Sequence, residues 1–181
     1  RTIDDLLELS RIEASEGTLR DPVPVHLVLA EAVERAANAA EHRGITLDLR
    51  EPPHGLEVRG DRRQLASAVF NLLDNAIKYS QPGSTVRVGA ECDGTSAKLV
   101  VGDDGIGIPR RDLERIFERF YRVDRARSRD TGGTGLGLAI VRHVASNHGG
   151  DITVESREGE GSTFRLCLPL DVPSDRSTTI A

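Results

Sequence analysis

Hydrophobic residues recur three or four positions apart in several parts of the chain, which is the period of an amphipathic α-helix. This pattern predicts helices at residues 1–14, 25–43, 61–79, 109–120 and 136–147. Elsewhere apolar and polar residues alternate, which predicts strands at residues 45–49, 56–59, 86–88, 98–101, 151–156 and 163–168. Hairpins and helices in this order favour a layer of helices on a mostly antiparallel sheet.

The pattern also divides the chain into four parts. Residues 1–14 have a broad apolar surface, as expected of the end of a longer helix that packs in a bundle. Residues 15–24 are polar, end in Pro-Val-Pro and are predicted to be a linker. Residues 25–170 form the predicted folded domain, and residues 171–181 a flexible tail.

Composition excludes several classes of protein. The chain has 181 residues, enough for one domain, and 38% of them are hydrophobic, enough for a core. A net charge of -5 and only 3% aromatic residues argue against a general nucleic-acid binder. No apolar run is long enough to cross a membrane, so we expect this segment to be soluble and cytoplasmic. Cys92 and Cys167, in predicted strands, are expected to be reduced core residues.

The predicted helix at residues 61–79 carries a polar stripe beside its apolar one. Asn71, Asn75 and Lys78 lie four and three positions apart, roughly 135° around the axis from the apolar residues at about 100° per residue. The usual interpretation of such a stripe is a solvated face. Asparagine is a poor choice for an exposed mid-helix position, however, whereas its amide oxygen can bind Mg²⁺ and a nearby ammonium suits phosphate.

Two glycine-containing motifs are the other candidates for ligand binding. Asp103, Gly105 and Gly107 follow an apolar strand, where the glycines would let the backbone approach a flat ligand and Asp103 could accept a hydrogen bond from an amine such as that of adenine. Asp104 is predicted to cap the turn. Residues 132–138 (GGTGLGL) precede a helix and could bind phosphate through backbone N–H groups, although they match no Walker A loop. A tight turn and a flexible hinge are the alternatives.

Residues 110–130 form a basic segment in an acidic chain. We interpret it as a lid over a polyphosphate, anchored by Phe117 and Phe120, and the alternative is a solvated, charged helix. The five histidines show no metal-binding spacing, and His42, His143 and His148 are expected at helix ends or on the surface.

Together and in this order, these segments resemble the catalytic ATP-binding domain of a bacterial sensor histidine kinase. The resemblance covers residues 25–170 and rests on five motifs: NLLDNAIKYS (71–80), DDGIG (103–107), FERFYR (117–122), GTGLGL (133–138) and GEGSTF (159–164). Residues 1–14 resemble the end of the family's dimerisation and phosphotransfer helix. The fold implied is an α/β (α+β) two-layer sandwich, with helices on one face of a mixed, mostly antiparallel sheet.

The resemblance also implies roles for individual residues. Asp103 would bind the adenine amino group, with Thr163 assisting through water, and Asn75 would bind Mg²⁺ beside Asn71. The catalytic set implied is Asn71, Lys78 and Arg122, the last two contacting the phosphates. The remaining residues expected to bind ATP are Tyr79, Gly105, Gly107, Ile108, Thr134, Gly135, Leu136, Gly137 and Leu138.

The activity implied is transfer of the γ-phosphoryl group of Mg·ATP to a histidine, for relay to a response regulator. No histidine of this chain lies in the family's His-Glu/Asp-x-Arg-Thr-Pro context, so the acceptor is expected on a dimerisation hairpin outside it. The parent is expected to be a membrane-anchored homodimer whose catalytic segment contacts neither membrane nor nucleic acid.

Three alternatives differ in what happens to the nucleotide. A gyrase- or chaperone-type ATPase carries a Glu as base where this chain has Asn71, whose amide cannot take a proton, so we expect slow hydrolysis. An anti-sigma-factor kinase would act on a partner's serine, which fits the helical stub and the basic lid poorly. A catalytically inactive nucleotide-binding module would only transmit conformation, and the intact Asn75, Asp103 and Lys78 argue against it.

Overall fold

The computed structural model describes residues 3, 6, 7, 10, 12, 21–123 and 133–170. The elements follow the order β1 (Asp21–Pro24), α2 (Val25–His42), β2 (Thr46–Leu49), β3 (Glu57–Gly60), α3 (Arg62–Tyr79), β4 (Thr85–Cys92), β5 (Ser96–Asp103), the 3₁₀ turns η1 (Arg110–Asp112) and η2 (Arg115–Phe117), α4 (Gly137–Asn147), β6 (Asp151–Arg157) and β7 (Gly161–Pro169). The described residues before β1 are helical, as predicted. The predicted tail, residues 171–181, and the end of the predicted lid lie outside the described residues.

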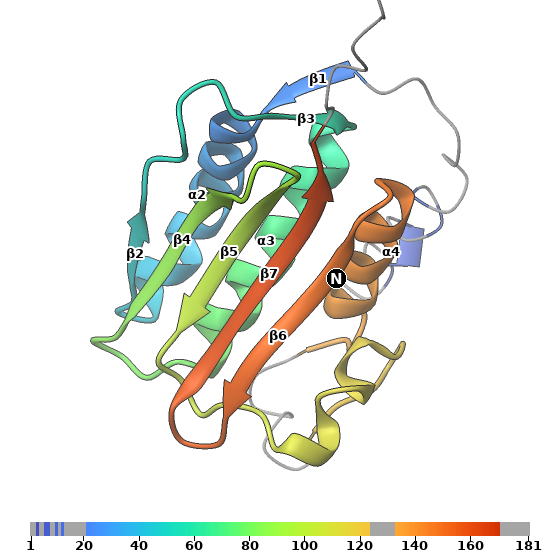
Figure 1. Cartoon of the computed structure of the whole chain (residues 1–181). Coiled ribbons are helices and arrows are strands. Elements are labelled where there is room, and N and C mark those ends of the chain that lie inside the picture. Colours follow the sequence, from blue (N-terminus) through green and yellow to red (C-terminus); the bar gives the residue numbers. More distant parts are fainter. Residues whose placement is uncertain are drawn as a thin grey trace, which may run out of the picture.

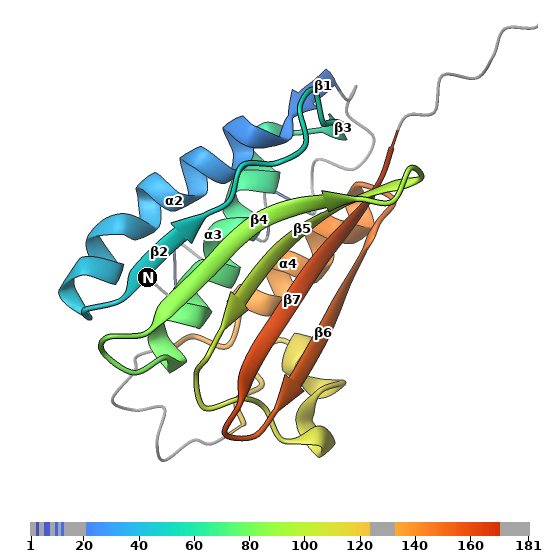
Figure 2. The same ribbon diagram turned by 60° about the vertical axis from the view of Figure 1, so that its left-hand side comes forward.

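Five strands form one sheet in the order β2-β4-β5-β7-β6. Only β2 and β4 pair in parallel, and the other neighbours are antiparallel. Helices α2, α3 and α4 cover one face of this sheet (Figure 1), and the view from the side shows the two layers (Figure 2). The predicted two-layer sandwich with a mixed, mostly antiparallel sheet is therefore confirmed.

A second, two-stranded sheet joins β1 and β3 in antiparallel register. The last four residues of the predicted linker therefore form a strand. Val23, in β1, is buried in the core, so this strand fixes the point at which the chain enters α2.

Helix α3 occupies the middle of the helical layer and contacts both α2 and α4. Its apolar stripe is buried as predicted, at Leu65, Ala68, Val69, Leu72, Leu73 and Ala76. The predicted N-cap is also confirmed, because the carboxylate of Asp61 accepts hydrogen bonds from the backbone N–H groups of Arg63 and Gln64 at 2.8 and 3.3 Å. With the apolar stripe packed in the core, the polar stripe at Asn71, Asn75 and Lys78 is left half-buried.

His148 connects the N-terminal end of α3 to the C-terminal end of α4. It caps the C-terminus of α4, which confirms the helix-end alternative of the prediction, and with 4% of its surface exposed it is buried rather than on the surface. The backbone N–H of Asp61 donates to Nε2 at 3.0 Å, and Nδ1 lies 2.7 Å from the carbonyl oxygen of Val144. Nδ1 therefore carries the proton and the ring is neutral. The ring fits because Gly60 has no side chain, since a Cβ there would overlap it.

The helix predicted at residues 109–120 is wrong, because η1 and η2 are separate single turns. The backbone becomes extended at Glu118 and left-handed at Phe120, where φ is 61°. The apolar spacing that suggested a helix instead places Ile116 and Phe117 in the core near α4.

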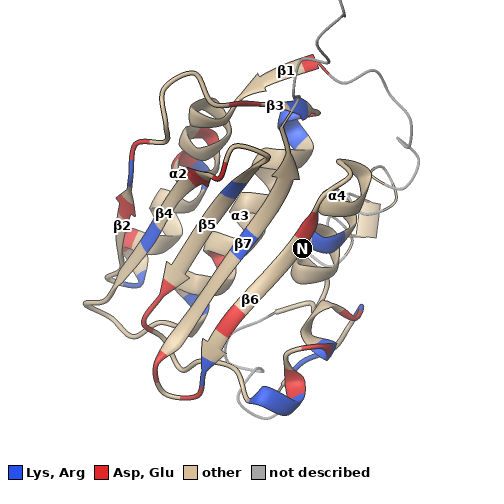
Figure 3. Cartoon of the chain, viewed as in Figure 1, with Lys and Arg blue, Asp and Glu red and all other residues tan. Residues whose placement is uncertain are grey.

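The two cysteines are more exposed than predicted, and the charged residues of both signs are mixed along the strands. Both thiols are free, but Cys92 is exposed and Cys167 half-buried, so neither is the core residue predicted. Figure 3 shows basic and acidic positions interspersed over the strands. Among the described helices, none is long and apolar enough to cross a membrane.

Candidate functional site

A cavity of about 1160 Å³ opens where the C-terminal ends of α3 and β5 meet the N-terminus of α4. Both stripe asparagines, both glycine motifs and the end of the FERFYR motif contribute to its wall. The predicted residues that line it are Asn71, Asn75, Lys78, Tyr79, Asp103, Gly105, Gly107, Ile108, Arg122, Thr134, Gly135, Gly137 and Leu138. Segments distant in sequence therefore form one site, with a volume just above the roughly 300–1,000 Å³ usual for ligand pockets.

Two predicted residues, Leu136 and Thr163, are absent from this wall. The Leu136 side chain is fully buried in the core. Thr163 alternates with Ser162 and Phe164, which do line the cavity, and its hydroxyl faces Gly102 on the other side of the sheet. The structure thus places Ser162, rather than Thr163, beside Asp103.

Asp103 is the buried carboxylate of the site, with 8% of its surface exposed. It accepts hydrogen bonds from the backbone N–H groups of Gly105, at 2.9 Å, and Ser162. Burial raises the pKa of its carboxyl group above the usual value, although these hydrogen bonds act in the opposite direction. When ionised, the Asp103 carboxylate can accept a hydrogen bond from an N–H group at the edge of a flat ring in the cavity.

Asp104 does not cap the turn as predicted. Both of its carboxylate oxygens accept from the guanidinium of Arg87, at 2.6 and 2.9 Å. This bidentate hydrogen bond lowers the pKa of Asp104 and raises that of Arg87. It ties the start of the loop after β5 to β4.

The glycines of the first motif serve contacts within the protein rather than with a ligand alone. A Cβ on Gly105 would lie 2.5 Å from the carbonyl oxygen of Tyr79, and one on Gly107 would overlap that of Arg157. Gly161 likewise approaches the backbone of Asp103 too closely for a side chain. The end of α3, the loop at residues 103–108 and the β6–β7 turn therefore meet backbone to backbone.

The other end of the cavity carries the amides and the ammonium group. Lys78 is paired with Asp74, one turn earlier in α3, and both side chains are largely buried. The amide nitrogen of Asn71 donates to the carbonyl oxygen of Ser67 at 2.9 Å, while a Cβ on Gly137 would lie 2.9 Å from its Oδ1. Asn71 thus sets the approach of α4 to α3, and Asp74 is a site residue that the sequence analysis missed.

The aromatic residues of the predicted lid are anchored differently from the prediction. Phe117 is buried and packs edge to face against Phe164, with ring centroids 6.5 Å apart, but Phe120 is 57% exposed. Tyr121 is the second anchor instead, because its hydroxyl donates to the buried Asp112 at 2.6 Å. This hydrogen bond raises the pKa of Tyr121.

Phe120 is held through its backbone. Its N–H donates to the carbonyl oxygen of Gly135 at 2.9 Å, where Gly135 is itself left-handed with φ of 73°. The bond joins the segment that carries Arg122 to the glycine loop before α4.

The oxygen donors suit one kind of metal ion. Among the described residues, no three His, Cys, Asp or Glu side chains form a group able to hold a metal. The oxygen donors lining the cavity near Lys78 are the amides of Asn71 and Asn75 and the carboxylate of Asp74. Mg²⁺ is commonly bound by one or two protein oxygens together with phosphates and water, so these residues fit Mg²⁺ that arrives with a nucleotide.

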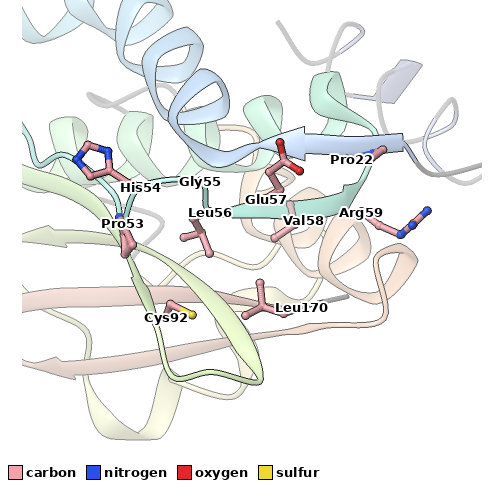
Figure 4. Close-up of a pocket in the computed structure, with 10 residues that line it drawn as sticks. All are labelled: Pro22, Pro53, His54, Gly55, Leu56, Glu57, Val58, Arg59, Cys92 and Leu170. Atoms are coloured by element: carbon pink, nitrogen blue, oxygen red, sulfur yellow. The ribbon is translucent and has the colours of Figure 1, made fainter. Parts of the chain in front are cut away.

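A second cavity, of about 500 Å³, lies at the opposite end of the large sheet. Figure 4 shows Leu56 and Val58 pointing toward Cys92 and Leu170 across it. None of the predicted site residues lines this cavity.

Comparison with known proteins agrees with this geometry. The family model for histidine kinase-, DNA gyrase B- and HSP90-like ATPases matches residues 60–172, more than half of the chain. The chain belongs to this ATPase family. Within it, the chain is 48% identical over 168 residues to the sensor-like histidine kinase SenX3 of Mycolicibacterium smegmatis, a match that covers 92% of this chain and 44% of SenX3. It is 40% identical over 164 residues to the phosphate regulon sensor protein PhoR of Pseudomonas aeruginosa, a match that covers 90% of this chain and 37% of PhoR.

Solved structures of this ATPase family have the same fold. The mycobacterial sensor histidine kinase MprB matches with a TM-score of 0.71 and 35% identity, over 83% of this chain and 97% of MprB. Full-length ShkA in complex with AMPPNP matches with a TM-score of 0.75 and 29% identity, over 91% of this chain and 34% of ShkA. The resemblance to a sensor histidine kinase ATP-binding domain is therefore confirmed. The chain spans less than half the length of SenX3 and PhoR.

The close backbone contacts predict a large difference between two glycine substitutions. Gly107→Ala and Gly159→Ala both place a side chain at positive φ, but only the first meets another backbone. We expect Gly159→Ala to lower the free energy of unfolding by about 1 kcal/mol. Gly107→Ala should lower it by about 3 kcal/mol or more, because the loop must move. Urea denaturation measures both, and equal losses would contradict the packing role of Gly107.

Proposed function

We propose that this chain binds Mg·ATP and donates the γ-phosphoryl group to a histidine on a dimerisation hairpin, for relay to an aspartate of a response regulator. The parent would be a homodimer anchored in the membrane, with this segment in the cytoplasm. The observation that carries the proposal is one cavity with a buried carboxylate, Asp103, at one end and the amide and ammonium groups of Asn75 and Lys78 at the other.

The Asp103 end is suited to adenine. An ionised carboxylate only accepts hydrogen bonds, so it pairs with an exocyclic amine and discriminates against a carbonyl at the same position. Ile108 and the backbone of Gly105 and Gly107 form the adjoining wall. Thr163 is left out of this role, because Ser162 lies on the side of the cavity.

The other end is suited to phosphates. Lys78 and Arg122 supply positive charge, and the N-terminus of α4 begins at Gly137 in the cavity wall. Asn75, with Asn71 nearby, would hold Mg²⁺, which when bound would neutralise charge on the phosphate oxygens. Because Lys78 is paired with Asp74, phosphate binding requires it to share or exchange that partner.

The chain contributes positioning and charge neutralisation rather than a base. Phosphoryl transfer needs the donor, the acceptor and the leaving oxygen in line, with the developing charge stabilised. Asn71 occupies the position of the base in hydrolytic relatives, and its amide cannot accept the proton of an attacking water. We therefore expect an imidazole nitrogen of the acceptor histidine, rather than water, to attack the γ-phosphorus, with ADP as the leaving group.

The proposal is tested by restoring the acceptor. The chain is mixed with the parent's histidine hairpin and γ-labelled Mg·ATP, and we expect acid-labile, base-stable phosphate on the hairpin. The chain alone should hold no stable phosphate and should release ADP slowly. Rapid steady-state hydrolysis without the hairpin, or acid-stable phosphate on a partner, would instead support the ATPase or the serine kinase alternative.

Lys78→Ala should weaken ATP more than adenosine, because only ATP places charge near the ammonium. Loss of one charge-assisted hydrogen bond predicts about a 10- to 100-fold weaker affinity for ATP. Calorimetric titration with both ligands measures the difference. Lys78→Arg, which retains the charge, serves as the control, and equal losses for ATP and adenosine would contradict the phosphate role.

Adenosine binding should weaken as the pH falls. Burial raises the pKa of Asp103, whereas an adenine amino group favours the ionised carboxylate, so protons and adenosine compete. We expect the affinity for adenosine to decline as the pH falls toward the raised pKa of Asp103, and Asp103→Asn to remove this dependence while weakening binding about 10-fold or more. Titrations across this range measure it. An Asp103→Asn variant with undiminished affinity would refute the role of the carboxylate.

A further inference from the structure

We infer that Ser156 is a positioning residue for the adenine end of the cavity, an inference that rests on the proposed function. Ser156 lies in β6, outside every motif on which the family resemblance depends, and is not among the residues that line the cavity. Its hydroxyl contacts the loop at residues 103–108, which does line it. Ser156 therefore acts on the nucleotide through this loop.

The hydroxyl of Ser156 uses its full hydrogen-bonding capacity. It donates to the carbonyl oxygen of Gly161 at 2.8 Å, accepts from the backbone N–H of Ile108 at 2.8 Å and lies 2.9 Å from the hydroxyl of Ser162. A hydroxyl has one proton and two acceptor positions. Because the proton is directed to Gly161, Ile108 and Ser162 are both donors to the Ser156 oxygen.

Ser156 belongs to a row of three residues across adjacent strands. Asp103 in β5 pairs with Ser162 in β7, and Ser162 pairs with Ser156 in β6. Side chains in register share one face of the sheet, which here is the side of the cavity. The N–H of Ser162 donates to the Asp103 carboxylate, and Ser156 binds Ile108. The loop at residues 103–108 therefore begins and ends on this row.

Two further hydrogen bonds hold the middle of the loop. Ile106 accepts from the N–H of Gly159 at 2.7 Å and donates to the carbonyl oxygen of Tyr79 at 3.2 Å. Ser156 completes this set at the end of the loop. Without its hydroxyl, the N–H of Ile108 loses its acceptor and the wall beside the adenine position shifts. The phosphate end, on α3, keeps its contacts.

The test compares two variants of the same shape, Ser156→Thr and Ser156→Val. Thr keeps the hydroxyl and Val replaces it with a methyl group, and both are favourable in a strand. We expect Ser156→Val to bind adenosine and ATP about 10-fold more weakly, by the same factor for each. Ser156→Thr should bind as the unmodified chain does. Amide exchange measured by NMR should be faster at Ile108 in the Val variant only.

Thr153→Val is the matched control, because it removes a hydroxyl from an exposed position of the same strand. It should leave both affinities unchanged. Wild-type affinities in Ser156→Val, a larger loss for ATP than for adenosine, or equal losses in the Thr and Val variants would each overturn the role of Ser156. If the unmodified chain binds no adenosine or ATP, the proposed function fails and this inference fails with it.

Discussion

The large cavity at the end of α3 depends on how closely three stretches of backbone approach one another. The end of α3, the loop after β5 and the β6–β7 turn touch at Gly105, Gly107 and Gly161, where a side chain would collide with a carbonyl group or another backbone atom. These contacts fix the backbone around Asp103, because the loop that follows it packs against the end of α3 and the β6–β7 turn. A buried carboxylate is costly unless it is hydrogen-bonded, and the same backbone supplies the N–H groups that it needs.

The two ends of the cavity use opposite electrostatic arrangements. At the Asp103 end, a carboxylate with a raised pKa is desolvated and bonded to backbone N–H groups. At the other end, the ammonium of Lys78 is paired with Asp74 before any phosphate is present. In the proposed function, a polyphosphate would compete with a carboxylate for Lys78. The existing pair would lower the net gain from that contact but keep the side chain in place.

The sequence predicts most of the fold, because periodicity reports which face of each element is buried. The apolar and polar stripes of α3, the Asp61 cap and the hairpins follow from local patterns. The region at residues 109–120 does not, since its apolar spacing serves separate turns that insert into the core. The strand alternation did contain the signal that Ser162 rather than Thr163 faces the cavity.

The sequence identifies the motif residues of the candidate site, but not the contacts that hold them in place. Asp74, Tyr121 and Ser156 act through pairings with Lys78, Asp112 and Ile108, and such pairings depend on tertiary contacts. The glycines were predicted from their freedom to approach a ligand, whereas here they also allow protein backbones to approach each other. A single sequence does not distinguish these two uses.

The hydrogen bond between Phe120 and Gly135 also bears on how this site can change during evolution. It ties together two points of the chain that flank residues 121–134. Both partners in this bond are backbone groups, so a substitution of the Phe120 side chain, which is 57% exposed, leaves the donor and the acceptor in place. Gly135 is constrained instead, because a side chain there would collide with the backbone of Phe120. The residue at position 120 can therefore diverge, within the limits of its left-handed backbone, while position 135 stays glycine.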